Sequence, residues 1–206
     1  MIETYRAPKT SANKIVFDGA PVIVLKKPKL WSGGEGSKTE VQAVWSSRGL
    51  HVGFKIYGKF ADATSDPKNK LSVQPDERVE VFILPTKSST FLGFEINRAL
   101  HILDFARGWG EPIDFSWNGH AHGTLLEKDG HPFLILTIPW TDLGYKKLPP
   151  KKGIKVGFYR DREKAAIKAK GDRSYIATCW IDPESQEFNF HRPSTFGNLE
   201  LVGSAS

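Results

Sequence analysis

Cysteine and methionine are almost missing from this chain of 206 residues, which contains one of each. With Cys179 as the single cysteine, the chain cannot form an intrachain disulfide or a metal cluster held by thiolates. Structural disulfides belong to oxidising compartments, so their absence favours a reducing one. Cys179 lies among small and apolar residues, which is typical of a buried side chain rather than a nucleophile.

Long apolar runs are also lacking. The longest, such as residues 133–139, are far shorter than the roughly 20 residues of a membrane-spanning helix, so no membrane partner is expected. The first residues do not match a signal peptide, because Glu3 stands where basic residues are expected and no apolar segment follows. The sequence as it stands therefore indicates a cytoplasmic protein, and an extracellular one only if a signal peptide has been removed.

Acidic residues are outnumbered by basic ones, 23 against 29, which gives a formal net charge of +6. The excess falls in segments broken by proline and glycine, at residues 26–29, 146–147, 151–152 and 162–173. A nucleic-acid site would gather basic residues on one face with aromatic residues between them, and the sequence does not have that pattern. We interpret the basic residues as a solvated surface and expect no nucleic-acid partner.

Short segments rich in β-branched and aromatic residues make up most of the chain. They predict strands at residues 22–25, 40–45, 50–57, 77–84, 91–96, 99–105, 120–126, 132–138, 154–160, 174–181 and 199–202. Asp129 and Gly130, between two apolar segments, predict a tight hairpin. Helix is expected only as two turns at residues 162–170 and a single turn at residues 140–143.

Many short strands without alternating helices predict an all-β fold, an antiparallel two-sheet β-sandwich of the jelly-roll kind. The sequence contains no linker, internal repeat or low-complexity segment. We therefore expect a single domain over residues 1–206, with its core at about residues 15–202.

The strongest predicted strands carry polar residues opposite their apolar face. Val79, Val81 and Ile83 alternate with Glu80, and the next strand places Glu95 and Asn97 opposite its own apolar residues. In the strand at residues 154–160, Tyr159 stands opposite Val156 and Phe158. One interpretation is a face exposed to water, for which lysine and threonine are typical. The other is a sugar-binding face, because acids and amides bond to vicinal hydroxyl groups and rings stack on pyranose C–H faces.

Several motifs resemble those of carbohydrate-binding module family 9-like domains, which are DOMON-like β-sandwiches. They are the acidic strand DERVEVFILP at residues 76–85, FLGFEIN at 91–97 followed by Asp104, TIPWTDLG at 137–144, VGFYR at 156–160, WIDP at 180–183 and FHRPSTFGNL at 190–199. The motifs occur in order and span roughly residues 15–202. The resemblance implies a sandwich that binds the ends of sugar chains on a concave sheet face, between two aromatic side chains.

Position by position, the resemblance implies a set of ligand-binding residues. Glu80 and Asn97 match polar contact positions of the family, Tyr159 lies near a third, and Phe190 matches one wall of the aromatic clamp. Glu95 takes a position that is basic in some family members. The second clamp aromatic usually precedes the acidic strand, where this chain has Val-Gln-Pro at residues 73–75. Trp180 or Trp109 is then the candidate, and the predicted site comprises Glu80, Glu95, Asn97, Tyr159, Trp180 and Phe190.

Calcium and haem follow from the same resemblance. Family members often carry a structural calcium ion, and loops with Asp18, Asp62, Asp66 and Asp76 offer the oxygen ligands that calcium prefers. Haem-binding sandwiches of related fold generally hold iron with a methionine plus histidine or lysine. Because Met1 is the only methionine, we expect no haem.

Two functions remain open from the residues alone. The first is non-catalytic binding of an oligo- or polysaccharide on the polar face. The alternative is a carbohydrate-active enzyme, a glycoside hydrolase or lyase, that uses Glu80 and Glu95 as an acid–base pair. A histidine cluster on the same face could serve instead, since His120 and His122 on one strand would point the same way and could share a metal ion.

Overall fold

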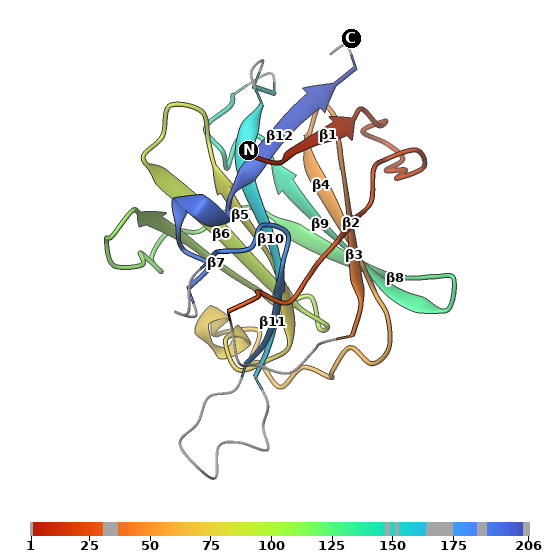
Figure 1. The fold of residues 1–206 in the computed structure, drawn as a ribbon, viewed down its shortest axis with the longest axis vertical. Coiled ribbons are helices and arrows are strands. Elements are labelled where there is room, and N and C mark those ends of the chain that lie inside the picture. Colours follow the sequence, from red (N-terminus) through yellow and green to blue (C-terminus); the bar gives the residue numbers. More distant parts are fainter. Residues whose placement is uncertain are drawn as a thin grey trace.

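Two β-sheets pack face to face in the computed structural model, which describes residues 2–30, 37–146, 149–150, 153–163, 175–184 and 189–203 (Figure 1). Sheet A has the order β1 (Thr4–Pro8), β12 (Gly197–Val202), β10 (Ile154–Glu163), β5 (Arg78–Leu84), β6 (Thr90–Asn97) and β7 (Ile102–Gly108), and β11 (Tyr175–Cys179) also pairs with β10. Sheet B has the order β2 (Ile23–Val24), β3 (Thr39–Trp45), β4 (Gly49–Ile56), β9 (His131–Pro139) and β8 (His122–Lys128). The predicted all-β, two-sheet sandwich is confirmed.

The core lies between the sheets and follows from the alternation seen in the sequence. Val79, Val81 and Ile83 of β5 point inward and are fully buried, and Val52 and Phe54 of β4 meet them from sheet B. Because side chains alternate along a strand, Glu80 and its neighbours are left on the outer face of sheet A.

The N-terminal strand β1 is a difference from the predicted strands. It pairs with β12 in parallel, from Thr4 opposite Asn198 to Pro8 opposite Val202, whereas the other paired strands described are antiparallel. Tyr5 fastens β1 to sheet B, because its hydroxyl donates to the Pro21 oxygen at 2.7 Å and accepts from the Ala43 N–H at 2.8 Å.

The predicted turns agree with the structure better than the predicted helix does. Asp129 and Gly130 join β8 to β9 with φ angles of 53° and 73°, the left-handed pair of a type I′ hairpin. A single turn follows β9, where the Leu143 N–H donates to the Trp140 oxygen. The start of the predicted helix at 162–170 is strand, because β10 continues to Glu163, and residues 164–170 lie outside the described residues.

Helix in the described ranges consists of the short 3₁₀ segments η1 (Lys70–Val73) and η3 (Pro193–Thr195). Within these ranges, no helix is long and apolar enough to cross a membrane.

Candidate functional site

The outer face of sheet A carries most of the polar residues singled out above. Register places Glu80 of β5 opposite Glu95 of β6 on one side and opposite Tyr159 of β10 on the other. Asn97 of β6 lies opposite Arg78, which is two residues from Glu80 and shares its face. The structure therefore brings Glu80, Glu95, Asn97 and Tyr159 onto one face.

Arg78 is the centre of this face. Its Nε lies 2.5 Å from Oε2 of Glu95 and 3.1 Å from Oε1 of Glu80, and its Nη2 lies 3.0 Å from Oδ2 of Asp161. Its Nη1 donates to the Gln74 backbone oxygen at 2.6 Å. Arg78 is absent from the predicted site, although its spacing from Glu80 already indicates the same face.

Burial and the neighbouring acids affect the protonation of Glu80. Burial, and after it the charge of Glu95, raises the pKa of Glu80 well above its usual value. Burial acts to lower the pKa of Arg78, but the charges of Glu95, Glu80 and Asp161 outweigh it, so the pKa is raised and Arg78 stays a cation. A protonated Glu80 is able to donate a hydrogen bond as well as accept one.

Asn97 belongs to a buried hydrogen-bond network next to Arg78. Its Nδ2 donates to Oδ2 of Asp76 at 2.8 Å and to Oγ of Ser65 at 2.6 Å. Its Oδ1 accepts from the N–H groups of Ala99 and His101. Because Asn97 is fully buried and these bonds use its amide, it holds the end of β6 in place.

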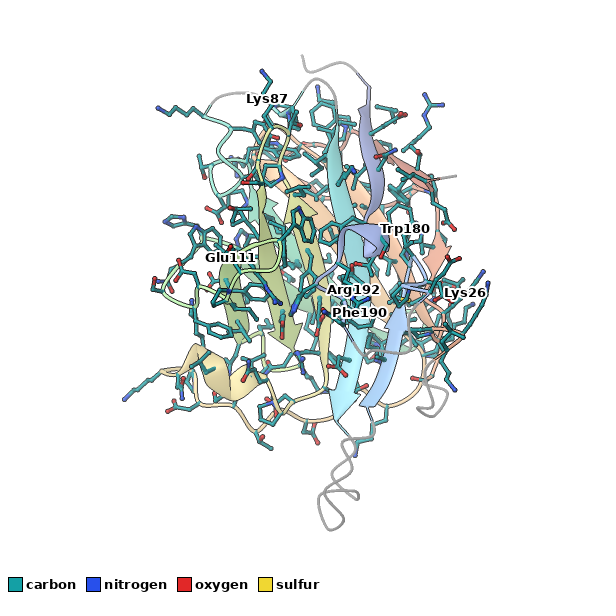
Figure 2. All side chains as sticks on the ribbon, turned by 60° about the vertical axis from the view of Figure 1, so that its left-hand side comes forward. Lys26, Lys87, Glu111, Trp180, Phe190 and Arg192 are labelled. Atoms are coloured by element: carbon teal, nitrogen blue, oxygen red, sulfur yellow. The ribbon has the colours of Figure 1, made fainter. Side chains whose placement is uncertain are left out.

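Tyr159 and Phe190 form the aromatic part of the face. The Phe190 ring lies on the Tyr159 ring, with centroids 4.2 Å apart and an angle of 27° between the planes. The Tyr159 hydroxyl donates to the Thr195 oxygen at 3.1 Å, so the segment of residues 189–196 is fastened across the sheet. Figure 2 shows Phe190 and Arg192 on this side of sheet A, with the loop of Glu111 beside them.

Glycines on the sheet make room for these rings. A Cβ atom at Gly93 would lie 2.2 Å from the Phe105 ring, and one at Gly157 would lie 1.9 Å from the Tyr159 hydroxyl oxygen. Phe105 and Tyr159 therefore lie close over the backbone of β6 and β10, where a larger residue would push them away.

His191 enters the aromatic cluster next to Phe190. Its ring centroid lies 5.0 Å from that of Phe82 and 5.8 Å from that of Phe91, and its Nδ1 lies 2.7 Å from Nη1 of Arg107. Burial, with the charges of Arg107 and Arg78, lowers the pKa of His191 to about 4. At neutral pH the ring is uncharged, and Nδ1 accepts the hydrogen bond from Arg107.

The two tryptophans that were candidates for the second aromatic wall lie on opposite faces of sheet A. Trp109 stacks on Phe91 at 4.9 Å, on the outer face and partly exposed. Trp180 stacks on Phe158 at 5.5 Å, on the core side, and its Nε1 donates to Glu3. The structure thus brings Phe190 and Trp109 to the candidate face, and it places Trp180 away from it.

Much of the candidate face is covered. Asn97 and Tyr159 are fully buried and Glu80 is 3% exposed, whereas the side chains of Arg78 and Glu95 keep 10% and 8% of their surface exposed. Of these residues, Arg78 and Glu95 have the most exposed side chains, although both are largely buried. Partly exposed side chains lie at the aromatic cluster of this face or next to it in the sequence: Arg107, Trp109, Ile113, Phe115, His191 and Arg192.

The histidine pair differs from the prediction. Strand β8 begins at His122, so His120 precedes the strand, and its Nδ1 bonds to Oδ1 of Asp142 at 2.9 Å on the protein surface. The nearby His101 bonds through Nδ1 to Ser65. Among the residues described, no three His, Cys, Asp or Glu side chains come together in a metal-binding group.

The four aspartates considered for calcium do not fit a shared ion in the described structure. Asp76 is buried, and its carboxylate already accepts from the N–H groups of Thr64 and Ser65. Asp62 pairs with Arg98 at 3.5 Å, and Asp66 accepts from the N–H of Lys68, which folds its own loop. Asp18 is exposed in a turn. Hydrogen-bond donors occupy the oxygens of Asp76 that a calcium ion would need.

Of the comparisons with known proteins, the one with solved structures shows the fold. No family model matches the sequence, and no curated protein matches it. A solved structure from Bacteroides uniformis, provisionally described as a carbohydrate-binding protein, superposes with a TM-score of 0.75 at 16% identity, covering 98% of this chain and 100% of its own.

Two further structures are a carbohydrate-binding module of family 9 from Caldicellulosiruptor kristjanssonii, in complex with cellotriose and with glucose. Their TM-scores are 0.61 and 0.59 at 14% and 15% identity, and the matches cover 98% of this chain and 95% and 97% of theirs. The chain therefore has the fold of the family 9-like modules.

Proposed function

We propose that this protein binds carbohydrate at the outer face of sheet A and carries out no chemistry on it. The observation that carries the proposal is the cluster of Arg78, Glu80 and Glu95 beside an aromatic cluster on one sheet face. The fold supports it, because structures of this fold include complexes with cellotriose and glucose.

The contacts expected of a sugar are at the edge of the Arg78–Glu95 ion pair. Glu95 and Arg78 are paired and largely buried, with 8% and 10% of their side-chain surface exposed. We expect this exposed edge to bond to vicinal hydroxyl groups, with charged hydrogen bonds of about 1.5–3 kcal/mol each. Trp109 offers a partly exposed ring for stacking on a pyranose. Four residues hold this surface in shape: Glu80, Asn97, Tyr159 and Phe190. Of these four, Phe190 comes nearest to the role of an aromatic wall.

Binding rather than catalysis is proposed because the two glutamates are already engaged. A retaining glycosidase needs carboxyl groups about 5–5.5 Å apart and an inverting one about 6.5–9.5 Å, each free to act on the sugar. Here Glu80 and Glu95 both contact Arg78. Both carboxyl groups are held against the same buried guanidinium, which leaves no free acid and base pair.

The test is titration with a panel of oligosaccharides, including cellotriose and glucose, followed by tryptophan fluorescence and product analysis in the same samples. We expect a saturable signal with intact sugar. Glu95→Gln should weaken binding at least tenfold, and the matched control Glu127→Gln, on exposed β8 of sheet B, should bind normally. Cleaved or eliminated products that disappear in Glu80→Gln would establish an enzyme instead, and a panel without any signal would refute sugar binding.

A further inference from the structure

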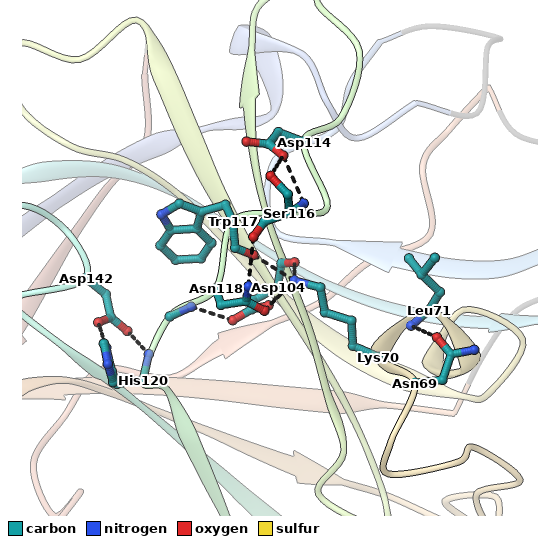
Figure 3. Close-up of polar contacts among 11 residues, drawn as sticks. Asn69, Lys70, Leu71, Asp104, Asp114, Ser116, Trp117, Asn118, His120 and Asp142 are labelled. Atoms are coloured by element: carbon teal, nitrogen blue, oxygen red, sulfur yellow. Dashed lines mark hydrogen bonds and ion pairs between the residues drawn. The ribbon is translucent and has the colours of Figure 1, made fainter.

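The Lys70 ammonium group lies in a cage of four oxygens, none of which belongs to the residues of the proposed binding face (Figure 3). Its Nζ is 2.7 Å from Oδ1 of Asp104, 2.9 Å from the Asp104 backbone oxygen, 2.7 Å from the Trp117 oxygen and 3.0 Å from Oδ1 of Asn118. An ammonium group has three N–H donors, so four oxygens exceed its directed hydrogen bonds. The arrangement is that of an ion in a coordination shell.

The cage is held together by bonds that do not involve Lys70. Oδ2 of Asp104 accepts from the Gly119 N–H at 2.7 Å, and Nδ2 of Asn118 donates to the Ser116 oxygen at 2.7 Å. Ser116 in turn donates from N and Oγ to Oδ1 of Asp114. The oxygens are therefore fixed in place, and without a cation they would face one another unpaired.

Three separate segments meet at this cage. Lys70 comes from η1, Asp104 from β7, and the Trp117 and Asn118 oxygens from the loop that leads to β8. Asn69 caps η1 by accepting from the Leu71 N–H at 3.1 Å, which sets the direction in which the Lys70 side chain leaves the turn. The ammonium group thus joins segments more than 30 residues apart in the sequence.

We propose that the cage is a structural cation site whose resident cation is the protein's own Lys70, and that it takes a free monovalent cation of ammonium size once the side chain is cut back. The charge balances, because one carboxylate, two backbone oxygens and one amide oxygen require a single positive charge. Calcium fits less well, since it takes six to eight oxygens at about 2.3–2.6 Å, whereas this cage provides four at 2.7–3.0 Å.

Lys70 also positions the proposed binding face. The residue that follows η1 is its C-cap Gln74, whose backbone oxygen accepts from Nη1 of Arg78. Fastening η1 to β7 therefore holds the carbonyl group that orients Arg78. This consequence rests on the proposed sugar binding, whereas the cation site itself does not.

The experiment compares Lys70→Ala, Lys70→Met and the exposed control Lys68→Ala by thermal unfolding. Each is measured in sodium, ammonium, methylammonium and calcium chlorides at equal ionic strength. We expect Lys70→Ala to melt about 4–8 °C lower than the natural protein and to recover part of that loss in ammonium or methylammonium but not in sodium. Lys70→Met fills the space without a charge, so it should melt lower and show no recovery. The natural protein and Lys68→Ala should be indifferent to the salt.

Three outcomes would overturn the proposal. They are an unchanged melting temperature in Lys70→Ala, a recovery no larger in ammonium than in sodium, and a recovery in calcium that equals or exceeds that in ammonium. If the Lys70 variants do not fold, the natural protein still tests the cage. Its lysine ammonium ¹H–¹⁵N spectrum should contain a slowly exchanging Nζ signal, and the absence of that signal would also refute the cage.

Discussion

Phe190 lies flat on Tyr159, with their ring centroids 4.2 Å apart, and the pair closes the aromatic side of the candidate face. Phe190 is 5% exposed, so replacing it removes packing as well as a ring. Phe190→Ala should lower the free energy of unfolding by about 3 kcal/mol and weaken sugar binding by about 1–3 kcal/mol. Urea unfolding and sugar titration measure the two effects.

A matched control separates these effects. Phe133 is buried to a similar degree, but it packs against Phe17 on the far side of sheet B. Phe133→Ala should lose similar stability with unchanged sugar affinity. Unchanged affinity in Phe190→Ala would remove this ring from the binding role.

The ion cluster around Arg78 predicts a large, pH-dependent effect. Arg78→Met removes the cation that contacts three buried carboxyl groups and should cost about 3–5 kcal/mol of stability at pH 7. The loss should shrink as the pH falls, because carboxylates that lack this cation are protonated and become neutral. The exposed control Arg48→Met should change stability by less than about 0.5 kcal/mol. An equal loss for Arg78→Met at pH 7 and pH 4 would contradict the role of these charges.

His191 predicts a loss of stability on acidification. Its pKa is about 4 in the folded protein, below the ordinary value near 6.5, so the unfolded chain takes up a proton first as the pH falls. This contribution is complete above pH 6.5 and is lost progressively towards pH 4, by at most about 1.4 kcal/mol per pH unit. His191→Gln should flatten the dependence in that window, as measured by urea unfolding at pH 7, 6 and 5. His51, whose pKa burial also lowers to about 4, supplies a second slope that remains in this variant.

The hydroxyl group of Tyr5 attaches β1 to sheet B, and removing it should lower the stability of the protein. Tyr5→Phe removes the acceptor of the buried Ala43 N–H and the donor to the Pro21 oxygen. The variant should lose about 1–3 kcal/mol in denaturant unfolding. Tyr57→Phe removes a hydroxyl that bonds Glu40 near the surface, and it should lose clearly less. Equal losses of stability in the two variants would mean that the buried hydrogen bonds of Tyr5 stabilise the protein no more than the surface bond of Tyr57.

The period of two along a strand explains why so much of the candidate face was predictable. Once β5 and β6 are recognised, Glu80, Glu95 and Asn97 must leave the core, and no tertiary knowledge is needed. The burial of Asn97 and Tyr159 could not be predicted from the sequence, because it depends on residues 64–76 and 189–196, which return over the sheet. The same limit applies to Trp180. Its side of the sheet follows from Cys179 pairing with Tyr159, a register that the sequence does not specify.

Strand β1 was not predicted from the sequence, for a related reason. It has five residues, ends in Pro8, and pairs in parallel with a strand almost 200 residues away in the sequence. A short segment with such a distant partner has little local pattern, and its identity depends on β12. The hairpin at Asp129 and Gly130 is the opposite case, because its two left-handed residues lie side by side in the sequence.

The parallel pairing of β1 with β12 gives the molecule a mechanical character. A pull on Thr4 and Val202 draws the two strands along their length in opposite directions, because the start of one and the end of the other lie at opposite ends of the pair. The force then loads all the hydrogen bonds between β1 and β12 at once, in shear, and does not unzip them one after another. Stretched from these two points, the domain resists until the two strands slide past each other.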